Sequence, residues 1–499
     1  MSLQTDRRTL EAENLIGART AQVLVRAEAL VPGAGRDAIE PLLADAALVI
    51  DAADLQADRI VLEGSVHCQA AYRQGEESVV KALTAHTTLN HVIELPGAQP
   101  GMLSRVRGEV SHVDAAYENG HMIFQVACTL TAQALRLSPE EVITGVSGAE
   151  GLQESCRELI SVKLAAEASE PALLKDSVAL PAALDARTAL MDWAAVEIES
   201  VAPDLGGVRV KGRLQVETLV SSGVTGRPAV VVRYPLSLDQ LVELPEWLAA
   251  DTWAEVDVRS LRSSIEPAAE DGDMRLACEA EVRVRVLANA TDRVSALADI
   301  YATRGNALDV DFETLSLCVA AEHLRVNELA RGTVLIGENA PGVGTVLATR
   351  ARPVIGEWST ENGQGRIDGV IEAQVLYVPG GSDLPAAAEA ELPFSVTVPQ
   401  VLNDASLIDI QVLSAEANAL MSDRLELKLN LAVACDTRRR ERVQIVAEVE
   451  EDEPLIRRPG IVIRWPEASE SAWDIAKRYA VPVDAVGAVE PGMPVVVKV

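Results

Sequence analysis

The chain has 499 residues, and its 44 Lys and Arg against 75 Asp and Glu give a formal net charge of −31. This charge excludes nucleic-acid binding through a basic surface, because Lys and Arg must neutralise the phosphates. It also disfavours an anionic membrane surface as an electrostatic partner. An apolar content of 48% suffices for globular cores and excludes general disorder. The length predicts three or four domains.

No apolar run approaches the roughly 18 residues of a transmembrane helix. The first residues, MSLQTDRRTLEAENL, lack the apolar core of a secretory signal. We therefore expect a cytoplasmic protein.

Three stretches share one strand-like pattern around a central glycine. They are RIVLEGSVHCQAAYRQGEES, GVRVKGRLQVETLVSSGVTG and GRIDGVIEAQVLYVPGGSD, with central glycines Gly64, Gly212 and Gly369. Apolar residues alternate with polar ones, which predicts a half-buried strand. The glycine itself predicts a bulge or a close backbone contact. The predicted buried faces are Ile60, Leu62, Val66, Cys68 and Tyr72; Val208, Val210, Leu214, Val216 and Val220; and Ile367, Ile371, Val375 and Tyr377.

The similarity continues on both sides of these stretches. A second glycine follows each central glycine and is expected to supply the positive φ of a hairpin turn, at Gly75, Gly223 and Gly380. Further alternating segments come before and after, so a unit of roughly 130 to 150 residues occurs three times. We predict a mainly β protein, each unit an antiparallel sandwich or open barrel, with short helices near residues 36–46 and 182–192.

The search for catalytic and metal-binding motifs is negative. The chain has no phosphate-binding GxxxxGK[ST] loop, no G-x-S-x-G elbow and no His or Cys pair at zinc spacing. We expect no enzyme activity, no cofactor and no metal. The six cysteines are interpreted as buried, reduced residues, with Cys128, Cys278 and Cys435 in strand-like segments.

Two charged segments follow the third repeat unit. The run DTRRRERVQ, with arginines at 438–440 and 442, is interpreted as a solvated strand edge, and a docking patch is the alternative. Residues 451–458 contain like charges and a proline and are interpreted as a linker.

The last segment contains an amphipathic helix, ESAWDIAKRYAVPVDAV. Trp473, Ala476 and Lys477 share one side of this helix, and Ile475 and Tyr479 lie on another. Trp473 and Tyr479 are equally well explained as the core of a very small domain, which needs every large apolar side chain.

These motifs carry a resemblance to two known families. The stretches VLEGSVHCQAAY and VIELPGAQPGM resemble the DUF3794 or SPOCS domain of spore coat proteins. The C-terminal segment resembles a LysM module, with matches in order at Ser471, Ala472, Trp473, Ile475, Ala476, Tyr479 and Val481. The resemblance implies SPOCS repeats at 12–150, 151–315 and 316–450, the linker, and a βααβ LysM-like domain at 459–499.

Three such repeats before one LysM module resemble the SipL-like spore coat morphogenetic proteins. The resemblance implies a non-enzymatic scaffold in the mother-cell cytoplasm at the forespore surface, whose LysM-like module docks a SpoIVA-like coat ATPase, with other coat proteins as possible partners. The implied partner-binding residues are Arg464, Trp473, Ile475, Lys477 and Tyr479.

The alternative function is a cell-wall protein whose LysM-like module binds peptidoglycan or N-acetylglucosamine. Glycan-binding modules usually have Gly-Asp-Thr before the first helix and Asn after the second. Here EASES and GAVEPG stand at those places. The replaced residue types favour a protein partner.

Overall fold

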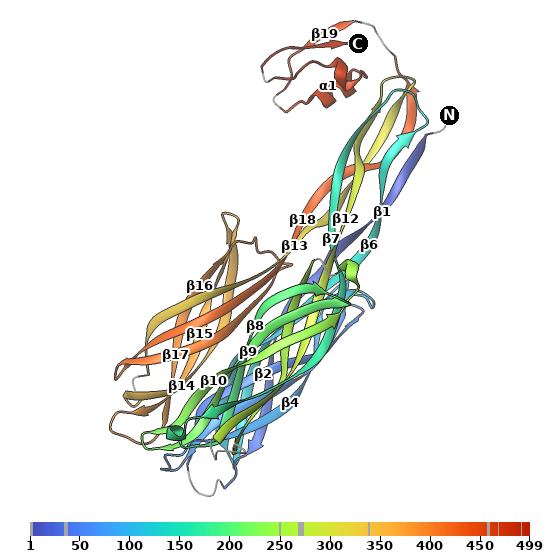
Figure 1. Cartoon of the computed structure of the whole chain (residues 1–499). Coiled ribbons are helices and arrows are strands. Elements are labelled where there is room, and N and C mark those ends of the chain that lie inside the picture. The colour runs from blue at the N-terminus through green and yellow to red at the C-terminus, as the bar shows by residue number, and fades with distance from the viewer. Residues whose placement is uncertain are drawn as a thin grey trace.

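The computed structural model describes residues 3–33, 38–248, 251–267, 274–337, 340–456, 460–467, 469–490 and 492–499. The chain is mainly β, and its strands form repeated three-stranded antiparallel sheets (Figure 1), as the sequence predicts. A run of six strands with the same pairing occurs three times, and we refer to these runs as the first, second and third unit.

Each unit consists of two sheets. In the first unit, β1 (Gln4–Leu30), β6 (His121–Ser147) and β5 (Leu103–Glu118) form one sheet, and β2 (Ile39–Gln56), β3 (Arg59–Gln74) and β4 (Lys81–Glu94) form the other. The second unit pairs β7 (Leu152–Leu180), β12 (Met274–Ala302) and β11 (Thr252–Pro267), and separately β8 (Ala186–Asp204), β9 (Gly207–Val224) and β10 (Arg227–Glu243). The third pairs β13 (Asn306–Leu335), β18 (Arg424–Pro454) and β17 (Leu407–Met421), and separately β14 (Val343–Glu361), β15 (Gln364–Pro379) and β16 (Ala386–Val398).

The middle strand of each second sheet carries the predicted buried face. All fourteen side chains predicted to be buried on β3, β9 and β15 are at most 2% exposed. They pack between the two sheets of their own unit. The alternating pattern therefore identified the core of each unit correctly.

The central glycines occupy one position in the three units. Gly64, Gly212 and Gly369 pair with Ile50, Ile198 and Ile355, and a β-bulge follows each isoleucine. A Cβ atom on these glycines would lie 2.3, 2.4 and 2.3 Å from a carbonyl oxygen of the bulged strand. The predicted close backbone contact is confirmed at all three.

The hairpin glycines follow the prediction only once. Gly75 has a φ of 59°, but positive φ values near the other two hairpins belong to Gly226 and Gly381. The expectation for Gly223 and Gly380 is therefore wrong, because those hairpins turn at a neighbouring glycine.

The two helices expected in the units are also wrong. Of residues 36–46, positions 36 and 37 lie outside the described residues, and β2 begins at Ile39. Residues 182–192 contain the short 3₁₀ turn η1 (Ala182–Leu184) and the start of β8. Both strands are buried on two faces, against their own unit and against the other units, so their apolar pattern lacks strict alternation.

Some of the domain limits given by the sequence fall inside strands, whereas the limit at 150/151 falls between β6 and β7. The limit at 315/316 falls inside β13, and the limit at 450/451 falls inside β18, so residues 451–454 of the expected linker continue that strand. The rest of that linker reaches position 458, and positions 457 and 458 lie outside the described residues. The division into domains stays a prediction.

The two long strands of each unit extend beyond their sheets as a stalk. Past residues 135, 288 and 436, the strands β6, β12 and β18 pair only with β1, β7 and β13. The three ribbons pack around apolar residues that include Leu10, Leu159 and Leu317. Figure 1 shows the stalk rising from the broader body, with the C-terminal segment at its far end.

Buried charges hold the units together where the stalk begins. Glu13 and Arg438 have fully buried side chains, and Arg438 Nη1 lies 3.3 Å from Glu13 Oε2. The same oxygen accepts a 2.8 Å hydrogen bond from the Leu164 amide. Glu13 thus joins the first unit to the second and third. The interpretation of Arg438 as part of a solvated edge is wrong, because β18 runs through the interior here.

The cysteines follow their interpretation with one exception. Cys68, Cys128, Cys278, Cys318 and Cys435 are buried, Cys156 is exposed, and all six are free thiols. Cys128, Cys278 and Cys435 lie on β6, β12 and β18, as their strand-like surroundings predict.

Candidate functional site

The C-terminal module comprises residues 460–499. It has a strand β19 (Ile461–Arg464), a helix α1 (Ala472–Arg478), a 3₁₀ turn η3 (Val483–Ala485) and a strand β20 (Val495–Lys498) that pairs with β19. A capping box between Ser471 and Asp474 starts α1. The second helix of the expected βααβ order is only a single 3₁₀ turn, so that order is not evident.

The core of the module includes a side chain from the stalk. Tyr301 of β12 is 5% exposed and packs with Ile475, Val481 and Val497. Its hydroxyl donates a 2.8 Å hydrogen bond to the Val481 carbonyl oxygen. The stalk tip is thus part of the module's hydrophobic cluster.

Trp473 and Lys477 also contact the stalk tip. Trp473 Nε1 donates a 2.7 Å hydrogen bond to Asp299 of β12, and its ring meets the Tyr301 ring edge-on at 5.0 Å. Lys477 Nζ lies 2.5 Å from the other Asp299 oxygen and 5.7 Å from the Phe312 ring of β13. One carboxylate therefore holds two of the five predicted residues.

The other three predicted residues lie elsewhere in the module. Arg464 extends from β19 and holds Glu470 with contacts of 2.9 to 3.2 Å. Ile475 is fully buried, and Tyr479 is partly buried against the same core. The five residues do not form one open surface, and their role in partner binding stays a prediction.

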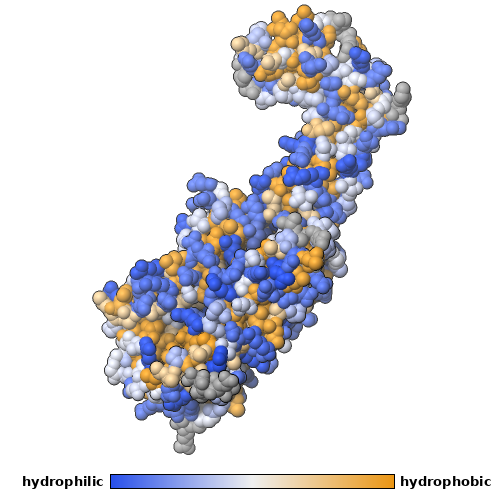
Figure 2. Space-filling model, in the orientation of Figure 1, coloured by the Kyte–Doolittle hydropathy of each residue, from blue (hydrophilic) through white to orange (hydrophobic). Residues whose placement is uncertain are grey.

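An exposed apolar face of the module was not singled out from the sequence. Ile461, Ile463 and Val496 are 71%, 58% and 48% exposed, and Trp465 after β19 is 65% exposed. Ile463 pairs with Val496, so these two side chains share one face of the small sheet. Figure 2 shows apolar residues gathered on the module. The alternation in IVIRW was the signal for this face.

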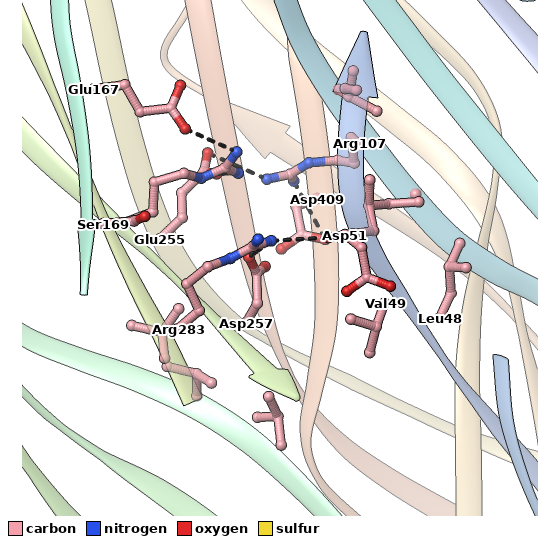
Figure 3. Close-up of a pocket in the computed structure, with 18 of the residues that line it drawn as sticks. Leu48, Val49, Asp51, Arg107, Glu167, Ser169, Glu255, Asp257, Arg283 and Asp409 are labelled. Carbon is pink, nitrogen blue, oxygen red and sulfur yellow. Dashed lines mark hydrogen bonds and ion pairs between the residues drawn. The ribbon is translucent and has the colours of Figure 1, made fainter. Parts of the chain in front are cut away.

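The three units meet around a charged cavity of about 440 Å³ (Figure 3). Arg107, Glu255 and Asp409 line it from β5, β11 and β17, at the same position relative to a β-bulge in each strand. Arg107 lies 3.7 Å from Glu255 and 3.3 Å from Asp409. Equivalent positions of the three units thus carry complementary charges and meet.

The arginines around Glu255 keep it ionised. Burial alone would raise the pKa of this carboxyl, but Arg285 and Arg107 hold the pKa below its ordinary value. Arg285 also lies 3.4 Å from Glu167 of β7, and Arg283 lies 3.1 Å from Asp257. The cavity wall is therefore a network of ion pairs that joins the units.

A second set of equivalent residues meets between the other sheets. Asp45, Trp193 and Arg350 each pair with the residue five positions after the central glycine of their unit. Arg350 Nε lies 3.0 Å from Asp45, and its guanidinium carbon lies 5.7 Å from the centre of the Trp193 ring. Here too, three different residues occupy equivalent positions.

Two further findings concern chemistry and membranes. Within the described parts of the chain, no three His, Cys, Asp or Glu side chains are placed to hold a metal ion. No helix among the described residues is long and apolar enough to cross a membrane.

Comparison with known proteins matches part of the first unit to a family model. Residues 39–118 match the family model described as SipL, SPOCS domain. The match begins at the first residue of β2 and ends at the last residue of β5, so it covers one sheet of the first unit and a strand of the other. No curated protein and no solved structure matches the chain. The match supports a SipL-like family and a sporulation-related protein.

Proposed function

We propose that the chain is a non-enzymatic scaffold of spore coat assembly, with three SPOCS-type repeats and a LysM-like C-terminal module that docks a SpoIVA-like coat ATPase. It would act in the mother-cell cytoplasm at the forespore surface. The observation that carries this proposal is the SPOCS match at residues 39–118. The repetition of the six-strand pairing in the second and third units supports it.

The position and charge of the module support the docking role. The module stands at the far end of the stalk (Figure 1), where a large partner can approach it. Residues 460–499 contain four Lys and Arg and five Asp and Glu, so the module is nearly neutral, whereas the whole chain has a net charge of −31. Its exposed apolar face includes Trp465, and aromatic residues are frequent anchors of protein interfaces.

The predicted partner-binding residues would contribute in two ways. Arg464 lies on β19 between Ile463 and Trp465 but points to the other face of the strand, where it holds Glu470, so it would support the exposed face by fixing the end of β19. Trp473, Ile475, Lys477 and Tyr479 would support that surface, because they hold the module's core or its contact with the stalk.

The test is a binding measurement between the full-length chain and the coat ATPase. A chain ending at residue 456 should lose binding, and Trp473→Ala should weaken it about thirtyfold, which corresponds to about 2 kcal/mol. Arg464→Ala should also weaken binding. Arg478→Ala is its matched control, since Arg478 lies 2.9 Å from the same Glu470.

Circular dichroism of each variant separates loss of binding from loss of folding. A folded Trp473→Ala, Arg464→Ala double variant that binds the ATPase as tightly as the unaltered chain would refute the docking proposal. Tight binding of chitin oligomers by the unaltered chain would instead support the N-acetylglucosamine-binding alternative.

A further inference from the structure

A second cavity, of about 330 Å³, lies where the second and third units meet. Its wall is formed by residues 198–201 of β8, residues 251–254 at the start of β11, Asn289 of β12, and Ala321, His323 and Arg325 of β13. Arg325 also lines the central charged cavity, so it lies between the two.

Four residues of this wall carry buried polar atoms without a hydrogen-bond partner among the described residues. These atoms are Trp253 Nε1, Asn289 Oδ1, His323 Nδ1 and Arg325 Nη1. Trp253 and Asn289 are each only 6% exposed. A buried polar group left unpaired costs about 1–3 kcal/mol. Four such groups on one cavity wall therefore favour a polar occupant.

The wall also carries a cation that the nearby carboxylates do not neutralise. Glu255 and Asp409 pair with Arg107, and Glu167 pairs with Arg285. Asp257 pairs with Arg283, and Asp51 with Arg259. None of these ion pairs includes Arg325. A mostly buried charge needs a counter-charge, because removal from water is otherwise unfavourable.

The repeat shows that this cation is particular to the third unit. Arg325 pairs with Ala434, which pairs with Asp409. In the second unit, the equivalent pairing runs from Glu255 through Arg285 to Ser169. In the first unit, it runs from Arg107 through Thr131 to Thr20. Two units thus have a hydroxyl where the third has a guanidinium, so the sheet itself does not require a charge.

The aromatic residues of the wall add neutral hydrogen-bonding groups. The Trp253 and His323 rings stack with centres 5.7 Å apart and an angle of 20° between their planes. Burial lowers the pKa of His323 below its ordinary value, although Asp436 and Glu255 act in the opposite direction. The imidazole is therefore neutral at pH 7, and the guanidinium of Arg325 provides the positive charge.

We propose that this cavity binds a small oxyanion, a carboxylate or phosphate group, with Arg325 as its counter-charge and the ring N–H groups of Trp253 and His323 as its neutral hydrogen-bond donors, while the Asn289 Oδ1 accepts from a water molecule bound beside the anion. Glu199 at the rim is already 3.6 Å from Arg213, whereas Asp251 is exposed there. The exposed Asp251 disfavours large polyanions, so the site suits a molecule with one anionic group. This site is independent of the docking proposed for the C-terminal module.

The test is thermal unfolding of the full-length chain with inorganic phosphate or with acetate, at constant ionic strength. At one hundred times Kd, the better ligand should raise the Tm of this 499-residue chain by about 3 °C. Arg325→Ser, which installs the residue of the second unit, should abolish the shift. The matched control is Arg331→Ser on the same strand, where the arginine is exposed and paired with Glu426. It should keep the shift.

Calorimetric titration of the same probes then measures stoichiometry, and one site per chain is expected. Trp253→Phe, which retains the ring and removes only the N–H donor, should weaken binding about tenfold. The proposal is wrong, and the cavity holds only water, if neither anion raises the Tm of the unaltered chain. It is also wrong if the anions raise the Tm of the Arg325→Ser variant as much as that of the unaltered chain.

Discussion

At the scale of single residues, the central glycines are required by a contact with backbone and not by a turn. The Val354 carbonyl oxygen would lie 2.3 Å from a Cβ atom at Gly369, and a carbon of the Phe394 ring would lie 2.7 Å away. A backbone oxygen within a paired strand cannot move aside as the end of a flexible side chain can. The β-bulge and the glycine therefore depend on each other.

Gly369→Ala should destabilise the third unit by about 3 kcal/mol, because the added methyl group overpacks this contact. The measurement is the midpoint of urea unfolding. Gly380→Ala is the matched control at the end of the same hairpin, where a Cβ atom meets nothing within 4 Å. Equal midpoints for both variants would show that the close contact does not constrain position 369.

Thiol reactivity should separate one cysteine from the other five. Burial raises the pKa of Cys68 to about 12 and those of Cys128 and Cys435 to about 11, so these thiols carry almost no thiolate at pH 8. Cys156 is exposed. Titration with a disulfide reagent should detect one fast thiol in the folded chain and six in denaturant. Two or more fast thiols in the folded chain would contradict this burial.

At the scale of elements, the helix α1 depends on the end of β12. Asp299 accepts the Trp473 hydrogen bond and pairs with Lys477, while Tyr301 completes the module's core. The sequence pattern identified α1 and its apolar residues. It could not identify Asp299 as their partner, since these residues are 174 or more positions apart and no local periodicity links them.

Asp299→Ala should loosen the module from the stalk. The loss of the Trp473 hydrogen bond to a carboxylate weakens the contact between the module and the stalk by about 1.5 kcal/mol. The fraction of molecules in which the module is detached from the stalk should therefore rise about tenfold. The Lys477 contact adds less because that side chain is more exposed. Amide hydrogen exchange in α1 should accelerate accordingly.

Asp292→Ala is the control for this experiment. Asp292 lies on the same strand but pairs with Lys163 within the stalk. If exchange in α1 is the same in both variants and in the unaltered chain, Asp299 does not hold the module in place.

The strands show where sequence reasoning succeeds and where it fails. Strands β3, β9 and β15 were predicted with their buried faces, because only one face of each packs in the core of its unit. The start of β2 was mistaken for helix because Leu42 and Leu43 pack between units while Ala44 packs within one. A strand buried on both faces loses the period of two on which the prediction depends.

At the scale of the whole molecule, three similar units are joined by dissimilar residues. Arg107 attracts Glu255 and Asp409, which occupy the equivalent positions of the other two units, and Arg350 attracts Asp45 in the same way. Three identical charges at either position would repel. The order of the units around the centre is therefore fixed by charge as well as by the chain.

The pH dependence of stability should reveal this centre. The folded state holds the pKa of Glu255 below its ordinary value. The ionised Glu255 therefore contributes fully to the free energy of unfolding above the unfolded carboxyl pKa of about 4.3. This contribution is lost as the pH falls through the lower pKa of the folded state. Glu255→Gln should be most destabilising at pH 7, and the difference from the unaltered chain should shrink toward pH 3 in urea unfolding.

Glu109→Gln provides a control of opposite sign. Burial raises the pKa of Glu109 despite Arg107 nearby, so its charged form is unfavourable in the folded state. This variant should gain stability at pH 7 and lose the gain in acid. Parallel pH profiles for the two variants would contradict the assigned environments.

The stalk has a consequence for how many partners the molecule can hold. The twelve residues 136–147 of β6 that extend beyond its pairing with β5 span about 40 Å at 3.3 Å per residue. A small domain is about 30 Å across. The stalk therefore acts as a mast that sets the C-terminal module clear of the body by more than the width of such a domain. A protein bound to the C-terminal module at the end of the stalk and another bound to the body would not collide, so one chain can set the spacing between two layers of an assembly.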